Sequence, residues 1–159
     1  MMNAKAQAWG FDLFIAAIIF VGGIIFFYLY TLNASSDQEA LPELIAEADM
    51  LATILLSEGV PPTWNTTTLS QIGLLTNNKI NETKLESFYN LSIQDYKKTK
   101  AITRLRYDYY ITFSEQITIN GQQLNGIGLT PNTPNHLAKL SRLTIYKNKP
   151  ISITVEVWA

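Results

Sequence analysis

The pattern of hydrophobic positions divides the chain into one unbroken apolar run and a longer part in which apolar and polar residues alternate. The run from Leu13 to Leu32 has twenty residues and no charged side chain. At about 1.5 Å per residue, a helix of this length crosses a hydrocarbon core of roughly 30 Å. The sequence therefore predicts a transmembrane helix over residues 13–32.

After this run, apolar residues recur every three or four positions, as they do on one face of a helix. Pro42 fits either the first turn of a new helix or a kink in one long helix. Gly59, Pro61 and Pro62 end the pattern, so the helical part is expected to reach residue 58. The apolar face of this second half comprises Leu41, Leu44, Ile45, Ala48, Leu51, Ala52 and Leu55.

The C-terminal part alternates with a period of two, which is typical of half-buried strands. One strand is predicted over 105–113. Asn120-Gly121 indicates a tight hairpin after a further short strand. The last two strands, 143–146 and 151–158, are joined by a turn at 147–150. One face of the strand predicted over 105–113 would carry Leu105, Tyr107, Tyr109, Ile111 and Phe113.

Two short helices are expected before the strands. One begins near Asn81, a residue type that caps helices, and the other runs from about Ser92 into Thr103. The order is then a long helix, short helices and antiparallel strands, which indicates an α+β fold. Because the second half of the long helix has one apolar face, residues 34–58 should pack on the head formed by residues 59–159.

Charge around the apolar run predicts its orientation. Lys5 is the only basic residue before it, and no Lys or Arg follows until Lys79. Basic residues favour the cytoplasmic side, so the N-terminus is expected inside and the head outside. N-x-[ST] sequons, which are candidate N-glycosylation sites, all lie after the run. They begin at Asn33, Asn65, Asn81 and Asn90.

A cleaved secretory signal is the alternative interpretation of the N-terminus. Such a signal has an apolar core of about 7–15 residues followed by small residues at the cleavage site. Here the apolar core is longer, and Leu32-Asn33-Ala34 has a bulky residue where a small one is needed. The aromatic residues between Phe26 and Tyr30 are instead typical of an anchor at a membrane interface.

Composition limits the classes of function. The chain has 159 residues, 12 basic and 13 acidic, so it has no positive field that would attract nucleic acid. After the span, roughly 125 residues remain, enough for one domain. Because the chain has no cysteine, a disulfide scaffold, a thiolate nucleophile and a cysteine metal site are excluded.

Residues that often carry chemistry do not form a recognisable site. His136 is the only histidine, which argues against a metal site, and Ser141 is not part of a G-x-S-x-G elbow. Asp108 is predicted to be a cross-strand charge partner rather than a catalytic acid. We therefore expect no enzyme activity, cofactor or metal. A solvated basic face is expected at Lys97, Lys98, Lys100, Arg104 and Arg106.

The N-terminal residues MMNAKA-QAWGFDLFIAAIIF resemble those of archaeal type IV pilin-like proteins with class III signal peptides. The stretches PPTWNTTTLSQIGLL, NETKLESFYNLSIQDYKKTK, RYDYYITF and ITVEVWA are also similar to those of small archaeal pilin-like surface proteins. The resemblance implies a leader at 1–6, cleavage between Ala6 and Gln7, and a long helix over 7–58 with an acidic residue, here Asp12, near its start. It also implies a prepilin peptidase and the pilus assembly machinery as partners.

Asp12 has two interpretations. An ionised carboxylate among apolar neighbours is costly, and the new α-ammonium at Gln7 of an adjacent subunit would neutralise it. That pairing would set the axial register of a filament. Alternatively, Asp12 lies in the lipid headgroup region beside Lys5 and has no special role. Gly22-Gly23 likewise fits either close helix approach or the ordinary frequency of glycine in membrane helices.

Three functions remain open. The first is a structural or minor subunit of a type IV pilus-like cell-surface filament, made as a single-pass membrane precursor and assembled with identical or related pilin subunits. The second is a pseudopilin-type component that serves adhesion or secretion. The third is a membrane-anchored binding ectodomain that does not polymerise. The first two require cleavage of the leader, and the third does not.

Overall fold

The computed structural model describes the backbone of residues 4–119 and 121–159, with the side chains of residues 4–9 and 33–40 outside the described part. The chain divides into two compact units, Met1–Glu39 and Ala40–Ala159. The helices are α1 (Ala4–Leu55), α2 (Glu82–Gln94) and α3 (Tyr96–Thr103). The strands are β1 (Leu75–Thr76), β2 (Lys79–Ile80), β3 (Asp108–Phe113), β4 (Ile117–Ile119), β5 (Gln122–Leu124), β6 (Ile127–Gly128), β7 (Leu137–Tyr146) and β8 (Lys149–Trp158). The predicted α+β class, with a long apolar N-terminal helix and antiparallel sheets, is confirmed.

Helix α1 belongs to both units, and Pro42 lies inside it rather than at the start of a separate helix. The helix ends at Leu55, three residues before the predicted end at residue 58. After Leu55 the chain turns through Gly59, whose φ of 76° suits glycine because it has no Cβ. A single helical segment therefore carries the chain from the apolar run into the head.

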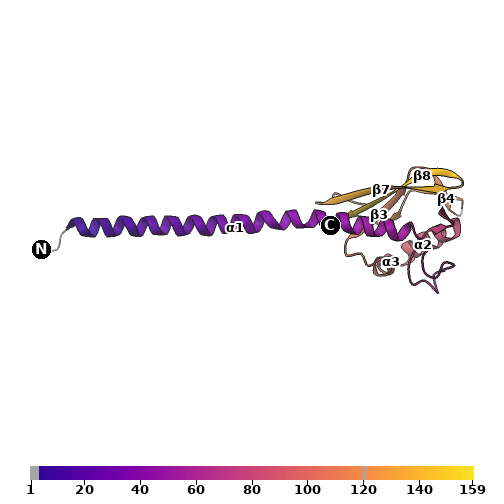
Figure 1. The fold of residues 1–159 in the computed structure, drawn as a ribbon, viewed down its shortest axis with the longest axis horizontal. Coiled ribbons are helices and arrows are strands. Elements are labelled where there is room, and N and C mark those ends of the chain that lie inside the picture. The colour runs from indigo at the N-terminus through magenta and orange to yellow at the C-terminus, as the bar shows by residue number, and fades with distance from the viewer. Residues whose placement is uncertain (1–3, 120) are drawn as a thin grey trace. The chain divides into compact units, whose positions relative to one another are not determined.

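In the head, the C-terminal part of α1 supplies one wall of the hydrophobic core. Leu44, Ala48, Leu51, Ala52 and Leu55 are buried there, as their spacing predicted. The two remaining members of that predicted face, Leu41 and Ile45, are exposed instead. Figure 1 shows the sheet along one side of this part of α1, with α2 and α3 on the other side.

The main sheet has four antiparallel strands in the order β6-β3-β8-β7. Strand β8 occupies a central position, and its side chains at Ile151, Ile153, Val155 and Val157 all face the core. The predicted hairpin at Asn120-Gly121 is confirmed by the pairing of β4 with β5, although Asn120 itself lies outside the described residues. The predicted strand pair at the C-terminus is also confirmed.

The turn between β7 and β8 is shorter than predicted, because it comprises only Lys147 and Asn148. Both residues have positive φ, 48° and 63°, as a two-residue type I′ hairpin requires. The turn fixes the register so that Thr144 pairs with Ile151. Cross-strand partners share a face of the sheet, so Thr144 is buried with Ile151 while Leu143 is 81% exposed.

The two short helices differ from the prediction at their junction. Ser92 lies inside α2, and the boundary is at Asp95, which ends α2 and caps α3 by accepting a hydrogen bond from the Lys98 N–H at 2.9 Å. The predicted start of α2 is confirmed, because the Asn81 side chain accepts a hydrogen bond from the Lys84 N–H at 3.2 Å. The carboxylate of Asp95 thus satisfies a free N–H at the start of α3, at the position where α2 ends.

The strand predicted over 105–113 begins only at Asp108. The N–H groups of Arg106 and Tyr107 donate instead to the Glu47 carboxylate of α1, at 3.1 to 3.2 Å. A side chain therefore takes the hydrogen bonds that a strand partner would have taken. Within β3, Tyr109 and Ile111 face the core as the alternation predicted.

Candidate functional site

The most distinctive surface of the described chain is the apolar segment Gly10–Leu32 of α1. Among the described residues it is the one helical stretch long and apolar enough to cross a membrane, and none of it is buried. Its large side chains are exposed by 40% at Ile15 and up to 73% at Phe26. Burying one such side chain is favourable by about 1.5–3 kcal/mol, so an apolar environment would stabilise the segment.

One face of the segment is hollowed. A shallow hollow of about 410 Å³ is lined by Phe14, Ala17, Ile18, Val21, Gly22 and Ile25. These positions follow the three- and four-residue spacing of a single helix face. A Cβ built at Gly22 or Gly23 would meet no atom within 4 Å. The described fold of this chain therefore does not itself require glycine at either position.

The residues predicted to act in maturation and assembly lie at the start of this helix. The side chains of Ala6 and Gln7, at the expected leader cleavage site, lie outside the described residues. Asp12 is described and exposed, and it is the one charged residue within the segment Gly10–Leu32. The structure thus places an ionisable group inside the stretch that would meet lipid or a neighbouring helix.

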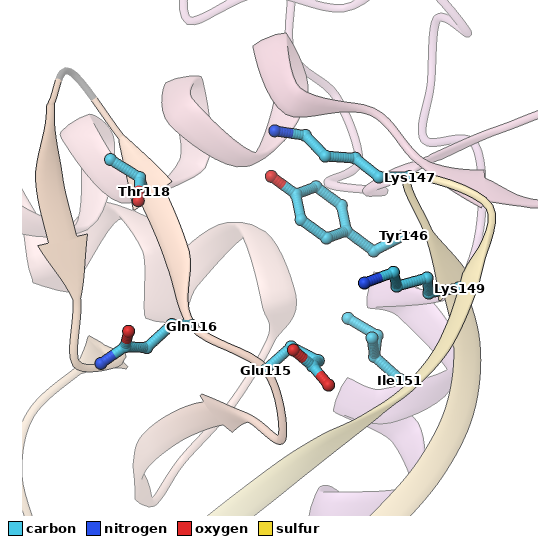
Figure 2. Close-up of a pocket in the computed structure, with 7 residues that line it drawn as sticks. All are labelled: Glu115, Gln116, Thr118, Tyr146, Lys147, Lys149 and Ile151. Carbon is cyan, nitrogen blue, oxygen red and sulfur yellow. The ribbon is translucent and has the colours of Figure 1, made fainter.

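The head contains a small cavity of about 230 Å³ at the end of the β7–β8 hairpin. Figure 2 shows Tyr146, Lys147 and Lys149 of the hairpin on one side of the cavity, and Gln116 and Thr118, just before and within β4, on the other side. Glu115 and Ile151 complete its lining. The cavity therefore combines an aromatic ring, two ammonium groups and a carboxylate on the surface of the head.

Two of the charged groups near this cavity are already paired. Lys147 Nζ lies 2.7 Å from Glu82 Oε1, and the Tyr146 hydroxyl donates to the same oxygen at 2.8 Å. The hydrogen bond from Lys147, followed by the one from Tyr146, lowers the pKa of the Glu82 carboxyl. The hydrogen bond to Glu82 in turn raises the pKa of the Lys147 ammonium group. Burial raises the pKa of the Tyr146 hydroxyl, which stays protonated at neutral pH. The groups stabilise one another rather than forming a nucleophile and its base.

The remaining candidates for chemistry are separated by the fold. His136 precedes β7, and its carbonyl oxygen accepts a hydrogen bond from the Ala159 N–H at 3.3 Å. Ser141 lies five positions along the strand, roughly 15 Å away at the rise of a β-strand, and its hydroxyl is bonded to Thr154. Among the described residues, no group of three or more His, Cys, Asp or Glu side chains is placed to hold a metal ion.

Asp108 has a different partner from the predicted one. Lys100 of α3, not a residue of a neighbouring strand, lies 2.8 Å from its carboxylate, and the Tyr96 hydroxyl donates to the same oxygen at 3.1 Å. Within the predicted basic face, Lys100 and Arg106 are thus engaged by carboxylates, because Arg106 also lies near Glu43 and Glu47. Asp108 joins α3 to β3.

The structure buries the side chain of Lys84, a role that was not predicted from the sequence. Its Nζ donates to the carbonyl oxygens of Glu58 and Leu75, at 2.8 and 2.6 Å, and burial lowers its pKa. The contacts tie α2 to the chain that follows α1. Lys84 precedes Phe88 by one helical turn, so its position on the buried face of α2 was available from the spacing.

The four sequons lie in different environments. Asn65 is exposed on the loop between α1 and β1, whereas Asn81 caps α2 and Asn90 is half-buried inside that helix. Asn33 lies in α1, and its side chain is outside the described residues. The structure therefore separates sequons that look equivalent in the sequence.

Comparison of this chain with protein-family models, with curated proteins and with solved structures gives no match in any of the three.

Proposed function

We propose that the chain is a structural or minor subunit of a type IV pilus-like cell-surface filament, made as a membrane-anchored precursor and assembled through its apolar N-terminal helix. The observation that carries the proposal is the exposure of the apolar side chains of Gly10–Leu32 in a chain whose head has its own buried core. Lipid would cover these side chains before assembly, and the helices of neighbouring subunits would cover them afterwards.

Asp12 favours a role beyond simple anchoring. A membrane helix that serves only as an anchor gains nothing from a carboxylate, since an ionisable group in lipid costs free energy. In the proposed filament, the α-ammonium at Gln7 of a neighbouring subunit offsets that cost and sets the axial position of one subunit on the next. The resemblance of the N-terminal residues to archaeal pilin-like proteins supports the same assignment.

Pairing of Asp12 is tested by comparing its variants in the cells that make the protein. Asp12→Ala and Asp12→Asn should strongly reduce incorporation into sheared surface filaments, whereas Asp12→Glu, which keeps the charge, should restore most of it. The measurement is the amount of the chain in the filament fraction relative to the membrane fraction. Equal incorporation of all three variants would remove the role assigned to Asp12.

Mass spectrometry of the membrane-associated and filament-associated chain tests the leader. The filament proposal predicts a chain that starts at Gln7 and retains Gly10–Leu32. A non-polymerising anchored ectodomain, the third of the functions left open by the sequence, would also use the exposed segment, as its anchor. It predicts an uncleaved N-terminus and membrane retention that does not depend on Asp12. The two candidates therefore differ in a single mass measurement.

A further inference from the structure

We propose that Asn65, in the sequon Asn65-Thr66-Thr67, carries an N-linked glycan in preference to Asn81 and Asn90. The proposal rests on the proposed function in one respect, because glycan transfer requires the head to be outside the cytoplasm. The sequons at Asn65, Asn81 and Asn90 differ in exposure, in backbone conformation and in how the side-chain amide is used.

The oxygen of the Asn65 amide is fixed by its neighbours. Oδ1 accepts hydrogen bonds from the N–H groups of Thr67 and Thr68, at 2.9 and 3.0 Å, and from the Thr68 hydroxyl at 3.2 Å. A backbone N–H can only donate, so the atom that faces these two groups must be the oxygen. The other amide atom, Nδ2, therefore points away from the turn.

Nδ2 of Asn65 is the atom to which a glycan would be attached. All hydrogen bonds of the Asn65 side chain within the described residues use Oδ1, so Nδ2 is not engaged there. Asn65 and Thr67 are both exposed, and the bond from the Thr67 N–H to Oδ1 folds the sequon into a tight turn. A transfer enzyme thus finds the amide nitrogen and the Thr67 hydroxyl accessible together.

The sequon at Asn90 lacks this access. Asn90 lies inside α2, where residues two apart point to different sides of the helix. Its hydroxyl residue, Ser92, is only 7% exposed and lies against the core. An enzyme that must contact both side chains cannot do so without unfolding this part of α2.

The sequon at Asn81 has its amide already in use. Oδ1 of Asn81 accepts from the Lys84 N–H and caps α2, while Nδ2 donates to the Thr76 hydroxyl at 3.2 Å. Modification at Nδ2 would compete with the contact to Thr76 and place a bulky sugar at the start of the helix. The structure therefore favours Asn65 over Asn81 for the same chemical step.

The reaction needs a sugar donor activated by phosphate, here a lipid-linked saccharide in the same membrane. Nδ2 gives one proton to a base of the transfer enzyme and forms a bond to the anomeric carbon of the sugar. The bond from that carbon to the phosphate oxygen of the lipid breaks, and the lipid phosphate leaves with the electron pair. Nothing is oxidised or reduced. Oδ1 keeps its three hydrogen bonds, so the folded loop is compatible with the product.

The test uses the full chain purified from the cells that make it. Cleavage after Trp64 and Lys79 yields a peptide that contains Asn65 and no other sequon, whose mass reports the glycan. The added sugar mass should disappear in Asn65→Gln and in Thr67→Ala, and should remain in Thr67→Ser. Thr67→Ala is a safe variant for folding, because only the backbone N–H of Thr67 contacts Asn65. Matched controls are Asn81→Gln and Asn90→Gln, which should leave the mass unchanged.

External protease on intact cells separates failure of this inference from failure of the proposed function. If the head is cleaved from outside while Asn65 is unmodified, the glycan assignment is wrong and the surface location stands. If the head is protected until the cells are lysed, both proposals are overturned. A glycan found on Asn81 or Asn90 in place of Asn65 would also contradict the assignment.

Discussion

The two parts of helix α1 differ in the exposure of their large apolar side chains: most are buried or half-buried in the head unit, and all that the structure describes are exposed in the N-terminal unit. Leu44, Leu51 and Leu55 in the head unit are fully buried, whereas Phe20 and Phe26 in the N-terminal unit are 69% and 73% exposed. Residue type does not explain this difference, because both parts are rich in large apolar residues. The arrangement of these residues around the helix explains the difference, because the head part is apolar on one face and the N-terminal part is apolar all round. A helix that is apolar all round requires an apolar environment on every side.

The comparison indicates where each part gains its stability. In the head, burial of apolar side chains occurs during folding and involves residues of the same chain. In Gly10–Leu32, where no residue is buried, the equivalent gain would come from an apolar environment such as lipid or the helices of other molecules. The head and the apolar segment should therefore respond differently to the same kind of substitution.

Charges placed in the apolar segment should have the largest effect. Ile19→Arg combined with Ile25→Arg should cost roughly 2.5–3.5 kcal/mol per arginine in membrane insertion, and should move the chain out of the membrane fraction. Folding of the head, followed by the fluorescence of buried Trp64, should not change. The matched control is Ile19→Leu with Ile25→Leu, which should stay in the membrane. Retention of the arginine variant in the membrane would show that this segment is not the anchor.

A pair of leucines tests the burial difference within the head. Leu51→Ala should lower the free energy of unfolding by about 2–5 kcal/mol, because it leaves a cavity in the core. Leu143→Ala should change it by no more than about 0.5 kcal/mol, because Leu143 lies on the open face of β7. Urea unfolding of the detergent-solubilised chain measures both. Similar losses at the two positions would contradict the register of β7 and β8.

Half-buried Tyr96 and buried Tyr109 predict a smaller effect that depends on pH. Burial raises the pKa of Tyr96 and of Tyr109 above its ordinary value of 10.0. Their contribution to stability is therefore fully present below pH 10 and is lost as the pH rises toward the folded-state pKa. Lys84 opposes this trend, because burial lowers its pKa and folding becomes more favourable as the pH rises toward 10.5.

We expect the two tyrosines to dominate over the single lysine, so stability should fall between pH 10 and 11. Tyr96→Phe should reduce the slope of that fall, and Lys84→Met should make the slope steeper. Unfolding free energies measured at several pH values check both signs. A slope that Tyr96→Phe leaves unchanged would show that the fall arises elsewhere in the chain.

Much of the fold was predictable because strong local patterns determine it. The apolar run, the face of α1 from Leu44 to Leu55, the cap at Asn81 and the alternation of β8 all reflect periodicity or capping chemistry that operates within a few residues. The order of these elements was then enough to indicate an α+β head. The prediction of filament assembly has no comparable structural test in a single chain, and it stays a prediction.

Features that depend on tertiary context were not predictable. Hydrophobicity alone would place Leu143 and Ile145 inward, but the two-residue turn sets a register in which Thr144 and Tyr146 face the core. Glu47 shortens β3 by binding two N–H groups nearly sixty residues away along the chain. Such contacts join segments that are distant in sequence, and no local pattern encodes them.

Dependence on tertiary context also explains why the candidate glycosylation sites could not be distinguished in the sequence. The four sequons have equal standing in the sequence, and only the folded chain shows that the Ser92 hydroxyl is buried and that both amide atoms of Asn81 are engaged. Asp12 stands out in the sequence because it is a single charge at the edge of an apolar run, and its role in assembly stays a prediction. Its partner would come from another copy of the chain, so neither the sequence nor the structure of one copy contains it.

Photo-crosslinking from Ile19, which is 70% exposed, tests the central claim most directly. A photoreactive residue at this position reports which molecule covers the apolar segment in the native cells. The account predicts lipid adducts in the membrane fraction and crosslinks between two copies of the chain, or to a related subunit, in sheared filaments. Crosslinks only to the head of the same chain, or a mature protein that lacks Gly10–Leu32, would contradict it.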